Sequence, residues 1–223
     1  MSIPISETFI SPQGEGITVG LMTLFIRVAG CDYATNGHPC KYCDTSYAWK
    51  SSNSKMFEVD DIQKQVELTM RTMNLKQVSL TGGEPLSYSP EINSLIHYLG
   101  KRFSLSVETN GGHPIWREDC MWSMDLKCPS SGNTKHNIYS NLKLLTNRDQ
   151  VKFVVETRDD YNFARDLVKS RVVFANVIFQ PSWKLLKHST LISWIKEDKD
   201  LMRIVRVGDQ LQKRWYPRLK KGV

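Results

Sequence analysis

The chain has 223 residues, of which 40% are hydrophobic and 24% are charged. This composition is typical of a folded globular protein and too apolar for a disordered one, and the length suits one large domain or two small ones. No apolar run approaches the roughly 20 residues that cross a bilayer, and the N-terminus lacks the apolar stretch of a signal peptide. We therefore expect a cytoplasmic protein without membrane contacts.

The net charge of +7 is concentrated at one end of the chain. Segment 203–223 has seven basic residues and one acidic residue, so it accounts for +6 of the total. The remainder of the chain is nearly neutral, unlike the broad basic surface that binds nucleic acid. A basic end is more often a solvated segment or a clamp for a small anion. We therefore do not expect nucleic acid as a partner.

Strand-like and helix-like segments alternate along the chain. Apolar runs predict strands over 21–28, 77–80, 103–107, 120–126, 151–155 and 172–179. Apolar residues at helical spacing predict helices over 57–73, 90–99, 159–168 and 185–195. This alternation indicates parallel βα units. Connections between 101 and 172 are short or irregular, and 223 residues are few for a closed eight-stranded barrel. We predict an α/β fold, an incomplete TIM-like barrel, in a single domain over 1–223.

Three of the five cysteines follow the first of these predicted strands. Cys31, Cys40 and Cys43 have the spacing C-x8-C-x2-C. With His38, which lies inside the loop, they could form a tetrahedral Cys3His zinc site. Alone, they could hold a 4Fe–4S cluster in which one iron has no protein ligand. Two further cysteines are expected to be bystanders, one packed and one in a turn: Cys120 and Cys128.

The turn after the next predicted strand reads Thr81–Gly82–Gly83–Glu84–Pro85. Two glycines allow a ligand to approach the main chain closely, and the Glu84 carboxylate could accept a hydrogen bond from an ammonium group. S-adenosylmethionine has such a group, and its amino and carboxylate atoms can bind an open iron. A three-cysteine loop followed by this turn therefore favours the iron–sulfur interpretation over zinc.

With these two motifs the sequence resembles the radical S-adenosylmethionine superfamily and, within it, the 7-carboxy-7-deazaguanine synthase family. The resemblance runs in order from about residue 5 to residue 181. The segments that carry it are QGEG (13–16), FIRVAGC (25–31), CKYCDT (40–45), TGGEP (81–85), ETNG (108–111), DLKCPSSG (125–132) and QP (180–181). The first two are specific to this family, whereas the cysteines and TGGEP indicate only the superfamily.

The resemblance implies a reaction and its cofactors. A carbon–nitrogen lyase of this family contracts the ring of 6-carboxy-5,6,7,8-tetrahydropterin to 7-carboxy-7-deazaguanine with loss of ammonia, in 7-deazapurine (queuosine-type) biosynthesis. It uses a 4Fe–4S cluster, S-adenosylmethionine as a catalytic cofactor, and Mg²⁺. A homodimer and an electron donor such as flavodoxin are implied as well. The radical chemistry belongs to the cofactor, so no side chain is assigned as catalytic.

The resemblance also assigns site residues. The cluster would be held by Cys31, Cys40 and Cys43, and Mg²⁺ by Thr45. The residues expected to bind substrate are Pro12, Gln13, Gly14, Glu15, Arg27, Thr81 and Glu108. The residues expected to bind S-adenosylmethionine are Gly82, Gly83, Glu84, Asp125, Lys127 and Gln180.

Simpler interpretations stand beside several of these assignments. The Arg27 guanidinium can pair with a carboxylate in bidentate fashion, as a pterin carboxylate requires, but it would also suit a surface salt bridge. The QGEG turn could read pterin edges or could be a plain hairpin turn. Thr45 and Asp44 could instead cap a helix N-terminus.

The chain departs from the family pattern in two places. The family's commoner cysteine spacing is C-x3-C-x2-C, and we interpret the longer first gap here as a surface excursion. Relatives tend to carry Gln-x-His-Lys near the end of the chain, whereas this chain has Gln212 where the histidine is expected. A histidine-dependent proton step is therefore not carried over, and the divergent basic segment 203–223 has no assigned role.

Two other functions fit part of the pattern. An activase that installs a glycyl radical on a partner enzyme would need the same cysteines, but the QGEG turn and Arg27 suit a small anionic heterocycle better. A non-catalytic zinc module with a nucleic-acid-binding tail would contain zinc without iron, and its affinity for DNA or RNA would depend strongly on salt.

Overall fold

The computed structural model describes residues 1–170, 173–219 and 221–223. Its strands are β1 (Ser2–Pro12), β2 (Met22–Val28), β3 (Lys55–Glu58), β4 (Gln77–Gly82), β5 (Ser104–Thr109), β6 (Met121–Asp125), β7 (Gln150–Val155), β8 (Asn176–Pro181) and β9 (Val205–Val207). Its α-helices are α1 (Asp32–Thr35), α2 (Val59–Thr72), α3 (Ser89–Leu99), α4 (Arg158–Ser170), α5 (His188–Lys196), α6 (Leu201–Ile204) and α7 (Leu211–Trp215).

The described strands form one nine-stranded sheet in the order β3-β1-β2-β4-β5-β6-β7-β8-β9. From β2 to β9 all neighbours are parallel, whereas β1 is antiparallel to both β2 and β3. Within the described part of the chain the two edge strands, β3 and β9, do not pair with each other, so the barrel stays open. This confirms the predicted α/β fold and incomplete barrel.

Most predicted elements are present with small shifts at their ends. Helix α2 shows why the pattern was readable: its buried residues, Val59, Ile62, Val66 and Met70, repeat every three to four positions and face the sheet. The strand predicted over 172–179 begins only at Asn176, and position 172 lies outside the described residues. Three strands were not predicted, namely β1, β3 and β9.

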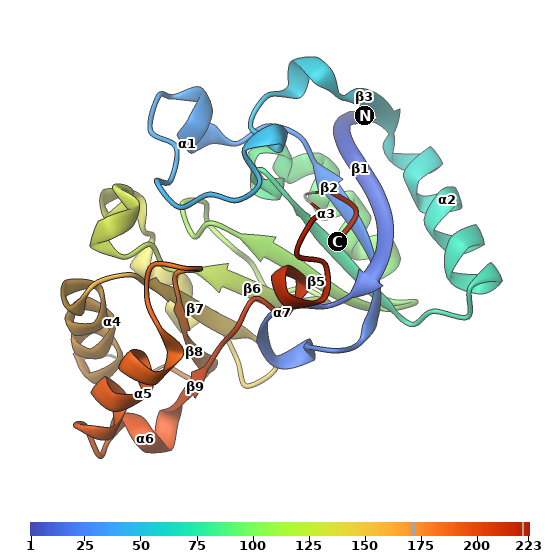
Figure 1. Ribbon diagram of the computed structural model, residues 1–223. Coiled ribbons are helices and arrows are strands. Elements are labelled where there is room, and N and C mark those ends of the chain that lie inside the picture. Colours follow the sequence, from blue (N-terminus) through green and yellow to red (C-terminus); the bar gives the residue numbers. More distant parts are fainter. Residues whose placement is uncertain (171–172, 220) are drawn as a thin grey trace.

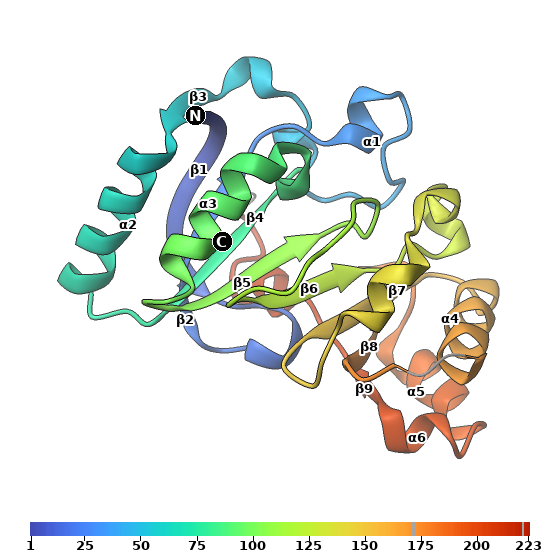
Figure 2. The same ribbon diagram turned by 180° about the vertical axis from the view of Figure 1, so that it is seen from behind.

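The two faces of the sheet differ in chemistry because side chains alternate along each strand. On β2, Leu24, Ile26 and Val28 belong to the apolar core, and Figure 2 shows α3 lying over that face of the sheet. The intervening positions of β2 face the other, inner side of the sheet. Strands β2, β4, β5, β6 and β7 line that side with buried polar residues: Thr23, Ser79, Ser106, Ser123 and Gln150. This polar inner face distinguishes the sheet from one that is apolar on both sides.

The described residues after β9 cross the inner face. In Figure 1 the segment that includes α7 passes in front of β2 and β5, on the side opposite α3. Lys213 Nζ lies 2.6 Å from Asp44 Oδ2, and the Gly222 N–H donates to Glu7 Oε2 at 3.1 Å. The basic C-terminal segment is therefore docked against the sheet by ion pairing and main-chain bonds.

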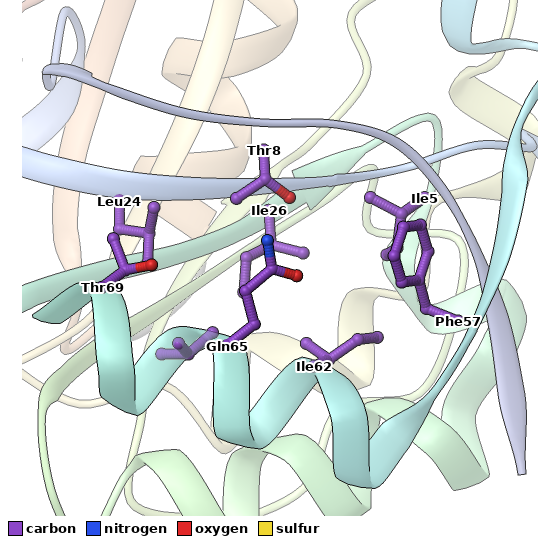
Figure 3. Close-up of a pocket in the computed structure, with 9 residues that line it drawn as sticks. Ile5, Thr8, Leu24, Ile26, Phe57, Ile62, Gln65 and Thr69 are labelled. Carbon is purple, nitrogen blue, oxygen red and sulfur yellow. The ribbon is translucent and has the colours of Figure 1, made fainter.

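A small apolar cavity lies on the other side of the sheet, between β1, β2 and α2 (Figure 3). Leu24, Ile26 and Ile62 contribute to its lining. Its volume of about 10 Å³ is room for roughly one water molecule, so it is a packing defect rather than a ligand site. None of the helices in the described residues is long and apolar enough to cross a membrane.

Candidate active site

The turns after β2 and β4 are joined into one rim at the carboxyl edge of the sheet. The Gly83 N–H donates to the Val28 carbonyl at 3.0 Å, and the Glu84 N–H donates to the Gly30 carbonyl at 2.8 Å. A Cβ on Gly83 would collide with the Gly30 carbonyl oxygen, so this approach requires glycine. The cysteine loop and the TGGEP turn therefore occupy one place in the fold.

All three predicted cluster ligands lie on this rim as partly exposed, free thiols. The Trp49 Nε1–H donates to the Sγ of Cys43 at 3.2 Å, and the Asn133 Nδ2 donates to the Sγ of Cys40 at 3.5 Å. Burial raises the pKa of the Cys31 thiol to about 11 and also raises that of Cys40, so a metal must displace their protons. Accessible sulfurs that receive N–H bonds are the environment an iron–sulfur cluster uses.

The longer cysteine gap behaves as predicted, because residues 35–38 are exposed. His38 does not complete a zinc site with the cysteines. In the parts of the chain that the structure describes, no three His, Cys, Asp or Glu side chains are gathered closely enough to hold one metal ion. A single zinc ion draws all its ligands to within about 2.3 Å, whereas the thiolates of a cluster bind different irons. The three cysteines fit a cluster and do not form the Cys3His arrangement.

Glu84 lies in the rim, but its carboxylate points into the protein. It is fully buried and accepts hydrogen bonds from the Leu86 N–H (2.9 Å), the Asn110 N–H (2.6 Å) and the Thr109 hydroxyl (2.9 Å). Burial raises its pKa to about 7 in spite of these bonds. These bonds tie the rim to the end of β5. The contact of this carboxylate with the ammonium group of S-adenosylmethionine stays a prediction.

Glu15, in the QGEG turn, reaches across the inner face to strands β7 and β8. Its Oε2 accepts from Lys152 Nζ at 2.7 Å and from Gln180 Nε2 at 3.0 Å. Its Oε1 accepts from the Nε2 atoms of Gln210 (3.0 Å) and Gln212 (2.8 Å). Burial alone would raise the pKa of Glu15, but Lys152 and the amides lower it to about 2. The carboxylate is therefore ionised at neutral pH.

Two residues near the end of the resemblance and of the chain contact this carboxylate. Gln180 is assigned to S-adenosylmethionine by the resemblance. Its side-chain amide donates a hydrogen bond to Glu15, a residue assigned to substrate. Gln212, at the position expected for histidine, donates to the same carboxylate. The C-terminal segment, which had no assigned role, thus forms one wall of the Glu15 site.

A second carboxylate lies beside the first. Glu108 on β5 accepts from Gln13 Nε2 at 3.1 Å and from the Thr81 hydroxyl at 2.7 Å. Pro12 ends β1 directly before this turn, and the Gly14 carbonyl accepts from the Leu211 N–H at 3.0 Å. The residues predicted to bind substrate from β1, β4 and β5 are therefore neighbours.

Arg27 also points to the inner face, where it is paired. Its Nε donates to Glu7 Oε1 at 2.7 Å, and the Tyr47 hydroxyl donates to the same oxygen at 2.7 Å. The guanidinium carbon lies 5.4 Å from the ring centre of Phe9. The bond to Glu7 uses Nε and does not use the two terminal nitrogens, which form the fork that grips a carboxylate.

Lys127 and Asp125, assigned to S-adenosylmethionine, form a buried pair at the end of β6. The Lys127 Nζ lies 2.8 Å from Asp125 Oδ2, and Lys152 Nζ lies 3.3 Å from Asp125 Oδ1. Burial would lower the pKa of Lys127, but Asp125, through its charge and its hydrogen bond, acts with Cys40 and Tyr42 to hold that pKa well above the usual range. Asp125 thus contacts both Lys127 and Lys152, the lysine that pairs with Glu15.

Thr45 and Asp44 lie next to the C-terminal segment, where Lys213 and Gln210 contact Asp44 Oδ2. The Thr45 hydroxyl donates to Asp44 Oδ1 at 3.0 Å. Thr45 precedes the short 3-10 helix Ser46–Ala48 but makes no capping bond through its side chain. Oxygen ligands of this kind suit the hard cation Mg²⁺. The capping interpretation of these two residues is therefore not supported by a hydrogen bond.

Sequence reasoning missed three residues of the site: Lys152, Glu7 and Gln210. A signal for Lys152 existed, because Gln150 and Lys152 are the polar members of an otherwise apolar run on β7. Glu7 stands directly opposite Arg27, but β1 was not predicted. Gln210 lies near the end of the chain, and its proximity to Glu15 depends entirely on the tertiary fold.

An open parallel barrel with three cysteines on its carboxyl rim defines a radical S-adenosylmethionine enzyme, and residues 26–120 match the family model for the Radical SAM superfamily. Three curated 7-carboxy-7-deazaguanine synthases are similar to the chain. The protein from Methanospirillum hungatei is 37% identical (79% of this chain, 71% of that protein). That from Chlorobaculum tepidum is 33% identical (96% and 94%), and that from Koribacter versatilis is 31% identical (97% and 98%).

The chain belongs to the 7-carboxy-7-deazaguanine synthase family. A crystal structure of QueE from Escherichia coli has the same fold, with a TM-score of 0.71 over 94% of both chains at 22% identity. Membership makes the chain a radical lyase that uses a 4Fe–4S cluster and S-adenosylmethionine, as predicted.

Proposed function

We propose that the chain converts 6-carboxy-5,6,7,8-tetrahydropterin to 7-carboxy-7-deazaguanine and ammonia. The observation that carries this proposal is the polar inner face below the cysteine rim, where Glu15, Glu108, Gln13 and Arg27 converge. These groups match a flat heterocycle rich in N–H donors that also bears a carboxylate. Loss of ammonia from the substrate leaves the number of electrons unchanged, so no net oxidant is needed.

Bound together, the cluster and S-adenosylmethionine supply the carbon radical that starts the ring contraction. Cys31, Cys40 and Cys43 hold the cluster, and the main chain at Gly82 and Gly83 lies next to it on the rim. Catalysis by the protein is then largely a matter of holding the substrate in one orientation beside that radical.

The substrate would lie with its two ends recognised by opposite charges. The terminal nitrogens of Arg27 would grip the pterin carboxylate, in a bidentate, charge-assisted pair. The ionised Glu15 would accept from the ring N–H and amino groups at the other end, in place of the Gln210 and Gln212 amides that donate to its Oε1. Gln13, held by Glu108, would bind the polar edge between them. Polar recognition of this kind rejects analogues that lack the matching hydrogen-bonding groups.

We assign Mg²⁺ to Thr45, with Asp44 as an added ligand or partner of bound water. The two side chains are joined by a hydrogen bond, and Lys213 pairs with the other oxygen of Asp44. Mg²⁺ keeps several waters and binds through few protein oxygens, so this sparse set suits it. A charge there would stabilise negative charge that develops on substrate oxygens.

We further propose that the chain works as a homodimer and receives electrons from a small reductant protein such as flavodoxin. The partial exposure of all three cysteines supports electron entry at the rim.

Anaerobic reconstitution of the cluster, followed by incubation with S-adenosylmethionine, a reductant and the carboxytetrahydropterin, tests the proposal. Mass spectrometry should detect the deazaguanine acid and ammonia without matching net consumption of S-adenosylmethionine. Cleavage of S-adenosylmethionine without formation of the acid would reject this substrate.

A further inference from the structure

Lys152 lies on the inner face between Glu15 and Asp125. It comes from β7, and its side chain is 13% exposed. Its Nζ lies 2.7 Å from Glu15 Oε2 and 3.3 Å from Asp125 Oδ1. It is the cation paired directly with Glu15, whose other three partners are neutral amides.

The charged groups around Glu15 come from several elements. Beyond Lys152, they are Asp125 on β6, Lys127 after β6, Glu108 on β5, Asp44 in the cysteine loop and Lys213 on α7. Lys127 is paired with Asp125, and Lys213 is paired with Asp44. Without Lys152, Glu15 would therefore lie near three other carboxylates, while Lys127 and Lys213 are already paired with two of them.

Two residues of β7, Gln150 and Lys152, act on the QGEG turn in different ways. Gln150 accepts from the Ile17 N–H at 2.8 Å and donates to the Ser123 hydroxyl at 2.6 Å. A Cβ on Gly16 would collide with this amide. Gln150 thus fixes the main chain of the QGEG turn, whereas Lys152 contacts the carboxylate itself.

We propose that Lys152 is a positioning residue of the substrate site, which keeps Glu15 ionised and aimed at the N–H groups of a 2-aminopyrimidinone ring. This inference rests on the proposed function, because that function makes the ring the ligand of Glu15. The ring's donors need an acceptor, and a protonated carboxyl would present a competing O–H. Burial and the neighbouring carboxylates would both raise the pKa of Glu15 if the lysine were absent.

The probe is 6-carboxypterin, an unreactive analogue, titrated by calorimetry into the reconstituted protein with S-adenosylmethionine and no reductant. Dividing the variant Kd by the wild-type Kd at each pH cancels the titration of the ligand. For Lys152→Met we expect a ratio that is largest at pH 5 and falls as the pH rises to 8, by up to about tenfold per pH unit below the new pKa of Glu15. Lys152→Arg should keep the ratio near one at every pH.

Gln150→Ala is the matched control. It loosens the same turn without changing the charge next to Glu15, so its Kd ratio should exceed one and stay level with pH. A level ratio for Lys152→Met would overturn the proposal, because it would show that the lysine contributes only packing.

A second measurement needs no ligand and separates this inference from the proposed function. In the wild type Glu15 is stabilised in its ionised form. In Lys152→Met, folding must either protonate Glu15 or bury its charge without a cation beside it. The loss in free energy of unfolding caused by Lys152→Met should therefore grow from pH 4.5 to pH 7, and Glu15→Gln in the same chain should abolish that growth. If this loss grew with pH but the wild type did not bind the pterin, the proposed substrate would be rejected and the effect of Lys152 on Glu15 would stand. A loss that is constant with pH would reject the role of Lys152.

Discussion

Glu7 and Arg27 face each other directly across the antiparallel pair β1–β2, with Glu7 Oε1 2.7 Å from Arg27 Nε. Both side chains are more than four-fifths buried, and the Tyr47 hydroxyl donates to the same carboxylate. The pair fixes the guanidinium plane, so the terminal nitrogens are oriented before a ligand arrives. Orientation before binding reduces the entropy that binding must overcome.

Arg27→Ala should therefore weaken substrate binding much more than it slows turnover. Loss of a charge-assisted pair is worth about 1.5–3 kcal/mol, which corresponds to a rise in KM of roughly 10- to 150-fold. Steady-state kinetics with the carboxytetrahydropterin measure it. Arg102→Ala, which removes an exposed ion pair with Glu67, is the control and should leave KM unchanged. An unaltered KM for Arg27→Ala would remove this residue from the site.

Cys40→Ala should prevent reconstitution of the cluster, because the remaining two thiolates hold it too weakly. Iron and sulfide content after anaerobic reconstitution give the answer. Cys128→Ala is the matched control: this thiol is fully buried in the core, so its variant should keep the cluster and lose only some stability. Equal iron content in the two variants would contradict the assignment of Cys40.

Glu84→Ala should lower the free energy of unfolding, because it leaves the buried N–H groups of Leu86 and Asn110 without an acceptor. Each such loss costs about 1–3 kcal/mol, measurable by urea denaturation. Glu58→Ala, at an exposed ion pair, should cost at most about 1 kcal/mol. If Glu84→Ala kept full stability and lost only affinity for S-adenosylmethionine, the carboxylate would be a ligand contact after all.

Gly14→Ala should displace the C-terminal segment, because the added Cβ would collide with the Gln212 side chain and lie 2.8 Å from its main-chain nitrogen. Trypsin should then cleave faster after Lys213 and Arg214, which α7 otherwise holds against the sheet. Val19→Ala, which truncates an exposed side chain near the same turn, is the control, and its cleavage rate should match the wild type. Unchanged protection in Gly14→Ala would show that the segment is held elsewhere.

Six of the seven described parallel strands, β2 and β4 to β8, could be predicted because they are short apolar runs that end in recognisable turns. The same runs placed Cys31, Thr81, Glu108 and Asp125 at one edge, since the carboxyl ends of parallel strands coincide. Strand β1 was missed because its burial is irregular and a bulge shifts its register between Ile5 and Glu7. Missing β1 meant that the partner of Arg27 was missed as well.

The direction of a polar side chain was harder to predict than its place. Glu84 was expected at the rim and lies there, but local sequence does not show that the main chain of Asn110 competes for its carboxylate. The role of the C-terminal segment had no local signal either. Its contacts with Gly14, Glu15 and Glu7 join residues about 200 positions apart, and such pairings leave no periodicity in the sequence.

The Glu15 carboxylate lies near the start of the chain. Two of the amides that donate to it, those of Gln210 and Gln212, lie near the end. During synthesis on the ribosome the sheet can begin to pair while those donors do not yet exist. Contacts of such long range close late in folding. A chain interrupted before residue 208 would keep most of its strands yet lack a wall of its pocket, so the ability to take up a pterin should be the last property the nascent protein acquires.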